Sequence, residues 1–246
     1  MKNITSRKNP ICVHVRNLGK SKEYRTNHGE FLCDGIKLFE EAVKSKASIT
    51  SAFMTSKLDL VIPKETELYM IDESIMDFIS PLKNPQEIMF VCKIPETANV
   101  NLSSGTHILL DAVQDPGNVG TIIRSADAFG IESLLLAENC ADPYNPKTIR
   151  ASMGAIFRQK ISYISLEELK ESKARIIGTH CSDCKDIRLV DLKDAIIVLG
   201  NEGQGISENL RLLCDEMVKI PLCADSESLN VAIAASIIMW EAQRGH

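Results

Sequence analysis

The sequence has no apolar stretch long enough to cross a membrane, and it does not begin with the apolar segment of a secretory signal peptide. Its most apolar stretch, residues 229–240, spans twelve residues and is interrupted by Asn230, whereas a membrane-spanning helix needs about 20. We therefore expect a cytoplasmic protein with no membrane partner. Its eight cysteines are expected to stay reduced.

The sequence also lacks an overall positive charge. The formal net charge is −5, so no global basic field points to a nucleic-acid partner. The charge is uneven, however, because residues 1–25 contain seven lysines and arginines and a single acidic residue, Glu23. This local excess fits either a solvated, partly disordered terminus or a surface patch that binds a polyanion.

Two kinds of ligand signature are missing. Cys181 and Cys184 form the only C-x-x-C pair, with His180 adjacent, but no second pair of ligands follows at zinc-site spacing, so we expect no metal. Neither the Walker pattern G-x-x-x-x-G-K-[ST] nor the dinucleotide pattern G-x-G-x-x-G occurs. A nucleotide hydrolase and a dehydrogenase are therefore weak candidates.

A polar, turn-rich segment divides the patterned regions of the chain. It covers residues 94–105, which we interpret as a linker. This predicts a small α/β domain at 1–93 and a second domain at 106–246. In the first, the residue pattern predicts an amphipathic helix beginning near Asp34. Strands are predicted at 49–55 and 88–94, and a short helix at 73–80.

The second domain alternates short apolar runs with helical patterns. Continuous apolar runs of this length are typical of strands buried on both faces of a parallel sheet. The predicted strands are 107–113, 132–137, 175–179, 195–199 and 217–222. The predicted helices are 119–129, 145–153, 166–172, 206–214 and 229–243. The pattern predicts an α/β layered fold.

Polar loops follow three of these strands, at the sheet edge where ligands of parallel sheets bind. The first, residues 115–120, contains two glycines, and Asn118 could cap the helix that follows. Thr121, Arg124 and Ser125 then fall on one polar strip of that helix. An arginine on this strip is more than a capped helix requires.

The second loop, residues 199–205, places Glu202 among three glycines, which suits a backbone pressed against a ligand. The third, residues 220–231, leads into the last helix, for which Ser228 could be the N-cap. That helix is apolar nearly all round, which predicts burial on more than one side, as at a subunit interface.

Together the three loops resemble the SpoU/TrmH family of RNA ribose 2′-O-methyltransferases, within the SPOUT class. The family patterns N-x-G-x-x-x-R, G-[N/S]-E-x-x-G and I-P-M-x-x-x-x-x-S-L-N-V correspond in order and spacing to residues 118–124, 200–205 and 220–231. Leu222 replaces the commoner methionine, one apolar residue for another. The resemblance covers about residues 107–243.

The first region resembles the family's small substrate-binding domain more loosely. The match rests on Arg25, Phe31 and Gly35, and Asp34 stands where the family often has glutamate. The resemblance implies a C-terminal SPOUT α/β knot, with a deep trefoil knot and a mostly parallel sheet, preceded by a small α/β substrate-binding domain. It also implies a homodimer formed through the C-terminal domain.

The resemblance further implies S-adenosyl-L-methionine as cofactor, RNA as substrate and a set of site residues. The cofactor would be held by Thr179, Gly200, Asn201, Gly205, Ile220, Leu222 and Leu229. The catalytic candidates are Arg124, Asn118, Glu202, Ser228 and Asn230. RNA would be bound by Arg7, Lys8, Arg16, Lys20, Lys22 and Arg25. Removal of residues 1–25 is then expected to weaken RNA binding and flatten its salt dependence.

The reaction implied is attack of a ribose 2′-hydroxyl on a sulfonium methyl group. The family's motif arginine, here Arg124, is the proposed base, but a guanidinium stays protonated in nearly all settings. We favour Arg124 as a phosphate ligand that stabilises the developing alkoxide, with Glu202 as general base the alternative. By family analogy, 23S ribosomal RNA is favoured over transfer RNA. Base methylation, a resistance role and a non-catalytic RNA-binding protein stay open.

Overall fold

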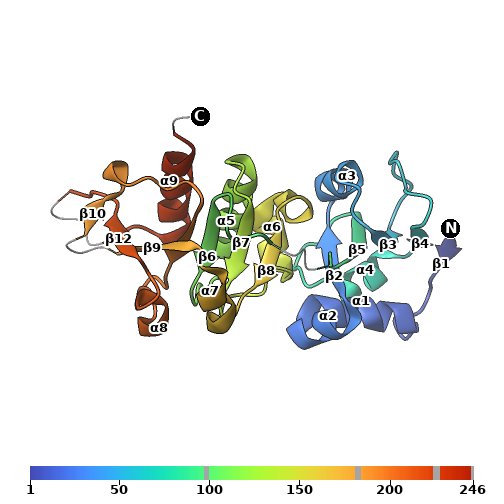
Figure 1. Cartoon of the computed structure of the whole chain (residues 1–246). Helices are drawn as coiled ribbons and strands as arrows, with labels where there is room; N and C mark the ends of the chain where they lie inside the picture. Colours follow the sequence, from blue (N-terminus) through green and yellow to red (C-terminus); the bar gives the residue numbers. More distant parts are fainter. Residues whose placement is uncertain (97–99, 181–183, 224–227, 245–246) are drawn as a thin grey trace. The chain divides into compact units, whose positions relative to one another are not determined.

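The computed structural model describes residues 1–96, 100–180, 184–223 and 228–244. The chain forms two compact units, each with its own sheet and helices (Figure 1). Unit 1 contains Met1–Glu96 and Asp142–Arg158, and unit 2 contains Thr97–Ala141 and Gln159–His246. Among the described residues, no helix has both the length and the apolar character needed to cross a membrane.

Unit 1 is built on a mixed five-stranded sheet in the order β1-β4-β3-β5-β2. Strand β5 is antiparallel to both of its neighbours, and the other pairs are parallel. The strands are β1 (Lys2–Asn3), β2 (Glu30–Asp34), β3 (Ile49–Met54), β4 (Glu67–Met70) and β5 (Ile88–Lys93). The helices before residue 97 are α1 (Pro10–Lys20), α2 (Lys22–His28), α3 (Ile36–Lys44) and α4 (Glu73–Ile79). The predicted strands β3 and β5 and helix α4 are confirmed.

The helix expected to begin near Asp34 begins at Ile36, and part of its apolar pattern belongs to a strand. Phe31 and Leu32 lie in β2, opposite Cys92 and Val91 of β5. Gly35 separates β2 from α3 with a φ of 105°, which favours glycine. Residues 30–34 therefore form a strand because they pair with β5, about sixty residues later in the chain. The local apolar periodicity of the sequence could not show this pairing.

Residues 10–28 form two capped helices, so they are not a disordered terminus. The side chain of Asn9 accepts a hydrogen bond from Ile11 N, and Pro10 occupies the first position of α1. The hydroxyl of Ser21 accepts one from Tyr24 N and caps α2. Buried side chains of α1 pack in the core of unit 1, namely Cys12, Val15 and Leu18.

Residues 142–158, which the expected boundary placed in the second domain, pack with unit 1. They contain α6 (Pro146–Ser152) and the 3₁₀ turn η1 (Ala155–Phe157). The Asp142 carboxylate accepts hydrogen bonds from Arg25 Nε and Nη2 at 2.9 and 2.5 Å, and Arg25 Nη1 donates to the Leu18 carbonyl at 2.6 Å. Arg25 is 3% exposed. The prediction that Arg25 contacts RNA is therefore wrong, because its guanidinium is buried and already bonded.

Unit 2 contains a seven-stranded sheet in the order β10-β12-β9-β11-β6-β7-β8, in which all pairs are parallel. The strands are β6 (His107–Leu110), β7 (Ser133–Leu136), β8 (Ile161–Tyr163), β9 (Arg175–Thr179), β10 (Lys185–Asp186), β11 (Ala195–Leu199) and β12 (Glu216–Lys219). The five predicted strands are confirmed. Strands β8 and β10, of three and two residues, were too short to stand out.

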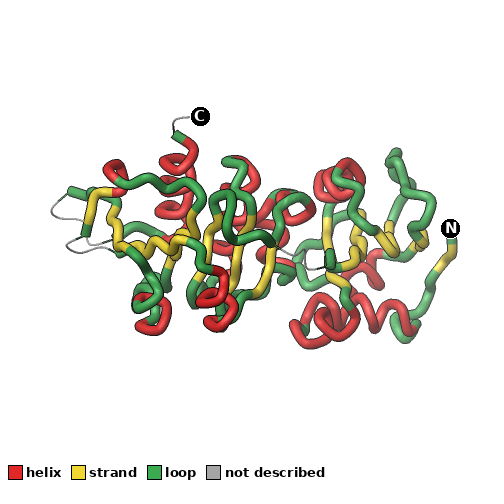
Figure 2. The backbone as a smooth tube through the Cα atoms, in the orientation of Figure 1, coloured by secondary structure: helices red, strands yellow, loops and turns green. Residues whose placement is uncertain are grey.

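Helices cover both faces of this sheet, with α5 and α9 on one side and α7 and α8 on the other (Figures 1 and 2). They are α5 (Pro116–Ala128), α7 (Leu166–Ser172), α8 (Glu208–Arg211) and α9 (Val231–Gln243), and the 3₁₀ turn η2 covers Ile187–Leu189. The α/β fold with a mostly parallel sheet is confirmed. The trefoil knot stays a prediction.

Candidate active site

The loops that follow β9, β11 and β12 meet around one cavity of about 290 Å³ at the carboxyl edge of the sheet. All of the residues predicted to hold the cofactor line it: Thr179, Gly200, Asn201, Gly205, Ile220, Leu222 and Leu229. Glu202 and Ser228 line it too. Its volume lies near the lower end of the roughly 300–1,000 Å³ typical of small-ligand pockets.

The loop after β11 is folded tightly on itself. The main chains of Asn201 and Gly205 exchange two hydrogen bonds, of 3.0 and 2.8 Å. The Asn201 side chain accepts from Gly203 N and Gln204 N and donates to the Ala112 carbonyl. A Cβ at Gly200 would lie 2.2 Å from the carbonyl carbon of Gly205. Gly200 is therefore required for the close approach that shapes this wall of the cavity.

Asp111, which sequence reasoning missed, ties the end of β6 to Ser207, the residue before α8. It follows β6 directly, is 6% exposed, and accepts a hydrogen bond from Ser207 N at 2.6 Å. The neighbouring residue, Ala112, has a φ of 53° and presents its carbonyl to Asn201. A carboxylate placed directly after a fully buried strand was the signal that could have identified Asp111.

Asn118 does not cap α5, contrary to expectation. Asp115 is the N-cap, and its carboxylate accepts a hydrogen bond from Asn118 N at 3.0 Å. The Asn118 side chain instead bridges two other loops. Its Nδ2 donates to Glu202 Oε1 at 2.5 Å, and its Oδ1 accepts from Asn230 Nδ2 at 3.1 Å.

Asn230, and not Ser228, caps α9. Its Oδ1 accepts hydrogen bonds from Ala232 N and Ile233 N, so α9 begins at Val231. The three predicted loops 115–120, 199–205 and 220–231 each contribute one residue to a continuous chain of hydrogen bonds. The chain runs from Glu202 through Asn118 to Asn230.

Arg124 lies outside this chain of hydrogen bonds. It is exposed on α5, and within the described part of the protein it has no hydrogen bond or ion pair. Its predicted neighbours on the polar strip are engaged: Thr121 donates to the Gly117 carbonyl, and the Ser125 hydroxyl is hydrogen-bonded to that of Ser236 on α9. Of the strip, Arg124 alone presents an uncommitted polar group.

Helix α9 buries one face and exposes the other. The buried side packs against α5 and includes Ala235, Ile238 and Met239. The exposed side carries an apolar stripe at helical spacing, consisting of Ile233, Ile237 and Trp240, which are 53%, 37% and 52% exposed. The apolar character expected all round this helix is therefore present on its exposed side too. Burial of that side at a subunit interface stays a prediction.

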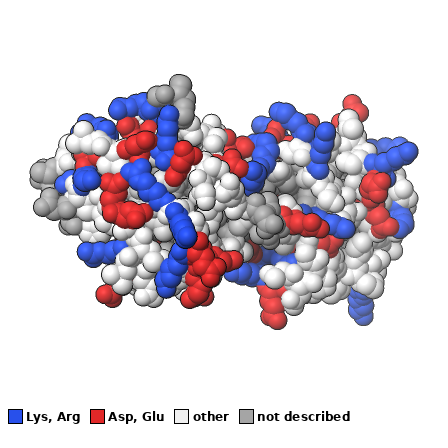
Figure 3. All heavy atoms as spheres, in the orientation of Figure 1, with Lys and Arg blue, Asp and Glu red and all other residues white. Residues whose placement is uncertain are grey.

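The basic candidates in unit 1 differ in their surroundings. Arg7, Lys8, Lys20 and Lys22 are exposed, and the Arg16 guanidinium lies over the Phe78 ring, 4.2 Å from its centroid. Acidic and basic side chains are interspersed on the face drawn in Figure 3. Cys181 of the C-x-x-C pair lies outside the described residues.

Family models match both parts of the chain. Residues 105–240 match the SpoU rRNA Methylase family, and residues 1–89 match the MRM3-like substrate binding domain. The chain is similar to the Bacillus subtilis 23S rRNA (guanosine(2553)-2′-O)-methyltransferase RlmP, with 34% identity over 98% of each protein. It is also similar to the Streptomyces viridochromogenes 23S rRNA (uridine(2479)-2′-O)-methyltransferase, with 28% identity over 91% of this chain and 86% of that protein.

Two solved structures are similar to this chain over nearly its whole length. An AdoMet-bound rRNA methyltransferase from Sinorhizobium meliloti has a TM-score of 0.87 and 28% identity, with 98% of this chain and 97% of that one covered. The SpoU methyltransferase AviRb from Streptomyces viridochromogenes, in complex with AdoMet, has a TM-score of 0.85 and 27% identity, with 96% and 98% covered.

Proposed function

The chain belongs to the SpoU rRNA methylase family, and we propose that it transfers a methyl group from S-adenosylmethionine to a ribose 2′-hydroxyl of 23S ribosomal RNA. The observation that carries the proposal is the meeting of three sequence-distant loops at one cavity, with Glu202 of its wall hydrogen-bonded to Asn118. Both relatives described above are named for 2′-O-methylation of 23S rRNA. We also propose that the protein acts in the cytoplasm.

The cavity suits the cofactor by its chemistry. Ile220, Leu229 and Ile238 line it with apolar surface on which an adenine ring can pack. The glycine loop exposes main-chain groups that a ligand can approach closely. Bound there, S-adenosylmethionine supplies a methyl group already activated by its sulfonium charge. The residues proposed to hold it are Thr179, Gly200, Asn201, Gly205, Ile220, Leu222 and Leu229.

Arg124 is proposed to hold the target phosphate and to stabilise the negative charge that develops on the 2′-oxygen as the hydroxyl proton passes to water. A guanidinium stays protonated and presents paired hydrogen-bond donors to a phosphate. It can therefore stabilise negative charge without giving up or taking up a proton. Its exposed, uncommitted side chain is available to an incoming nucleotide. Asn118 and Asn230 position Glu202 through the hydrogen-bond chain, and Ser228 is proposed to contact the ribose from the cavity rim.

The alternative in which Glu202 is the general base can be separated from the proposal by turnover measurements. Arg124→Ala is expected to lower kcat by about 100- to 1,000-fold, the usual effect of removing an electrostatic stabiliser. Arg124→Lys should retain part of the activity, because charge survives but paired donation is lost. Glu202→Gln keeps an acceptor for Asn118 and should cost less than Arg124→Ala. Near-normal turnover of Arg124→Ala would overturn the role given to the arginine.

Ribosomal RNA is proposed over transfer RNA because a substrate-binding unit precedes the methylase unit and the two are matched together in the 23S rRNA relatives. A non-catalytic RNA-binding protein is disfavoured by the intact hydrogen-bond chain of Glu202, Asn118 and Asn230. RNA contacts are assigned to exposed or part-exposed basic residues of unit 1, namely Arg7, Lys8, Arg16, Lys20 and Lys22.

A homodimer through α9 completes the proposal. The exposed stripe of Ile233, Ile237 and Trp240 is apolar surface that a second copy of the chain would remove from water.

The decisive experiment maps 2′-O-methylated nucleotides by mass spectrometry in ribosomal and transfer RNA from cells with and without the protein. One ribose methylation of 23S rRNA should disappear with the gene, and purified protein should restore it with labelled S-adenosylmethionine. Loss of a base methylation, or of a transfer-RNA methylation alone, would contradict the proposal.

A further inference from the structure

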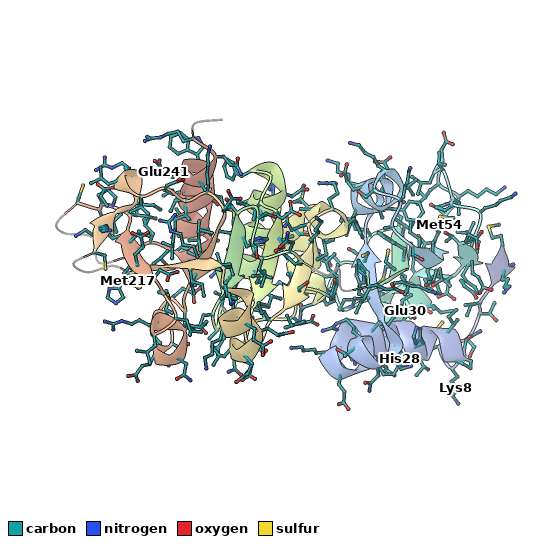
Figure 4. The ribbon with its side chains drawn as sticks, in the orientation of Figure 1. Lys8, His28, Glu30, Met54, Met217 and Glu241 are labelled. Atoms are coloured by element: carbon teal, nitrogen blue, oxygen red, sulfur yellow. The ribbon has the colours of Figure 1, made fainter. Side chains whose placement is uncertain are left out.

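A cluster of aromatic rings on unit 1 lies outside the cavity and outside the role given to the basic residues. It joins His14 of α1, Tyr24 and His28 of α2, and Glu30 of β2. Figure 4 labels His28 and Glu30 at this place. Tyr24 and His28 are stacked, with ring centroids 3.9 Å apart and planes inclined by 22°.

Both rings of the stack are held in position by hydrogen bonds. His14 Nδ1 is 3.1 Å from the Tyr24 hydroxyl, and His14 Nε2 is 2.8 Å from Glu30 Oε2, so His14 links the tyrosine to a carboxylate. His28 Nδ1 is 2.9 Å from the Tyr24 carbonyl oxygen, which can only accept. Nδ1 of His28 therefore carries the hydrogen.

The stack runs from the core of unit 1 outward. Tyr24 is partly buried and packs against the core cluster that contains Val15 and Leu18. His28 rests on Tyr24 and is exposed. An aromatic ring that is fixed in orientation and supported on one side offers its other face to solvent at little entropic cost of ordering.

The elements that carry the stack hold charged residues of both signs, and Glu23 of α2 is exposed like its neighbour Lys22. Lys20 and Lys22 are exposed at the junction of α1 and α2, and Lys93 lies opposite Glu30 in the β2–β5 pair. Glu30 is itself bonded to His14.

We propose that the Tyr24–His28 stack is a platform on which an unpaired base of the RNA substrate stacks, against the outer face of His28. Unpaired bases are the part of RNA that proteins grip by stacking on aromatic rings, whereas phosphates are held by basic side chains. This inference rests on the proposed RNA substrate and adds to it a contact that does not depend on charge.

The test compares His28→Ala with His28→Phe, which keeps a ring, and with Asn27→Ala, an exposed neighbour on the same helix. Binding of unmethylated 23S rRNA transcript is measured by filter retention over a series of salt concentrations. His28→Ala should weaken binding by about fivefold to 100-fold, the effect of losing one stacked base. Its salt slope should match that of the wild type, because no phosphate contact is removed. His28→Phe and Asn27→Ala should bind like the wild type.

Thermal unfolding and S-adenosylmethionine titration of the same variants separate stacking from a structural role. If His28 only packs on the end of α2, His28→Ala lowers the melting temperature and leaves RNA affinity unchanged, and the proposal is overturned. It is equally overturned if His28→Phe binds as weakly as His28→Ala.

Ultraviolet cross-linking of the wild-type protein to the transcript gives a second measurement that needs no variant. The cross-linked peptide should contain Tyr24 or His28, and cross-links confined to other peptides would contradict the platform. If the wild-type protein binds the transcript but never methylates a ribose, the proposed function fails while the platform can still be judged by binding.

Discussion

Asn118 illustrates how a single side chain acquires a role at the residue scale. Because Asp115 caps α5, the Asn118 amide is released to join Glu202 and Asn230, which lie 84 and 112 positions away in the chain. One amide both donates to a carboxylate and accepts from a second amide, so it holds two loops at once. Its capping propensity was visible in the sequence, but its partners were not.

Replacing Asn118 with alanine is expected to lower kcat by about 10- to 100-fold, since hydrogen bonds to charged groups contribute roughly 1.5–3 kcal/mol. The affinity for S-adenosylmethionine should change little, because Asn118 does not line the cavity. Steady-state methylation of 23S rRNA transcript, with calorimetric titration of the cofactor, checks both statements. Gln114→Ala, at an exposed residue just before the N-cap of α5, is the control. Unaltered kcat in Asn118→Ala would contradict a positioning role.

The glycine loop offers a matched pair of substitutions. A Cβ at Gly200 would meet the Gly205 carbonyl carbon at 2.2 Å, whereas one at Gly203 would meet only Asn201 Oδ1 at 3.6 Å. Overpacking of the first kind typically costs about 1–3 kcal/mol. Gly200→Ala should therefore lose most of its S-adenosylmethionine affinity in a calorimetric titration, and Gly203→Ala should keep it. Equal affinities would show that the loop does not form the cofactor wall.

At the scale of elements, some strands and helices are recognisable from local sequence, whereas others are defined only by long-range pairing. The buried parallel strands β6, β7, β9 and β11 stand out in the sequence because both of their faces are apolar. Strand β2 does not, because its apolar residues merge with those of α3 until pairing with β5 separates them. Helix α9 shows both effects: its apolar character is evident locally, but only packing against α5 reveals which side stays exposed.

The exposed stripe of α9 predicts an oligomeric state that can be altered by one charge. Ile237→Glu places a carboxylate in the middle of the stripe, and burying it unpaired in an interface is unfavourable. Light scattering after size-exclusion chromatography should show a dimer for the wild type and a monomer for Ile237→Glu. Leu212→Glu, at a residue 77% exposed near α8, is the control and should stay dimeric. A dimer in all three proteins would place the interface elsewhere.

At the scale of the whole molecule, unit 1 is assembled from two separate stretches of chain. Residues 142–158 join it through the buried pair of Arg25 and Asp142 and through contacts of Phe31 with Tyr144 and Phe157. Removing residues 1–25, the truncation suggested by the charge pattern alone, would delete β1, α1 and Arg25. Loss of RNA binding in that truncation would thus report unfolding of unit 1. Point substitutions are therefore required to test whether the basic residues contact RNA.

Substitution of the four exposed basic residues Arg7, Lys8, Lys20 and Lys22 by alanine tests the electrostatic contribution to RNA binding. Each phosphate contact removed should reduce the slope of log affinity against log salt by roughly 0.7–0.9. S-adenosylmethionine affinity should be unchanged, since the cavity is lined by unit 2 residues. A slope equal to that of the wild type would exclude these residues as phosphate ligands.

The sequence by itself determined the α/β class, the central parallel strands and two of the loops that line the cavity, those at 199–205 and 220–231. Apolar periodicity, glycine and the spacing of polar residues are local properties of the chain, so they can be recognised without the fold. Only the tertiary structure decided that Asn118 bridges Glu202 and Asn230, that Arg25 is buried against Asp142, and that residues 142–158 pack with unit 1. These contacts join residues about 80 to 120 positions apart. Which polar groups meet there depends on how the sheets and helices pack, and no local pattern records it.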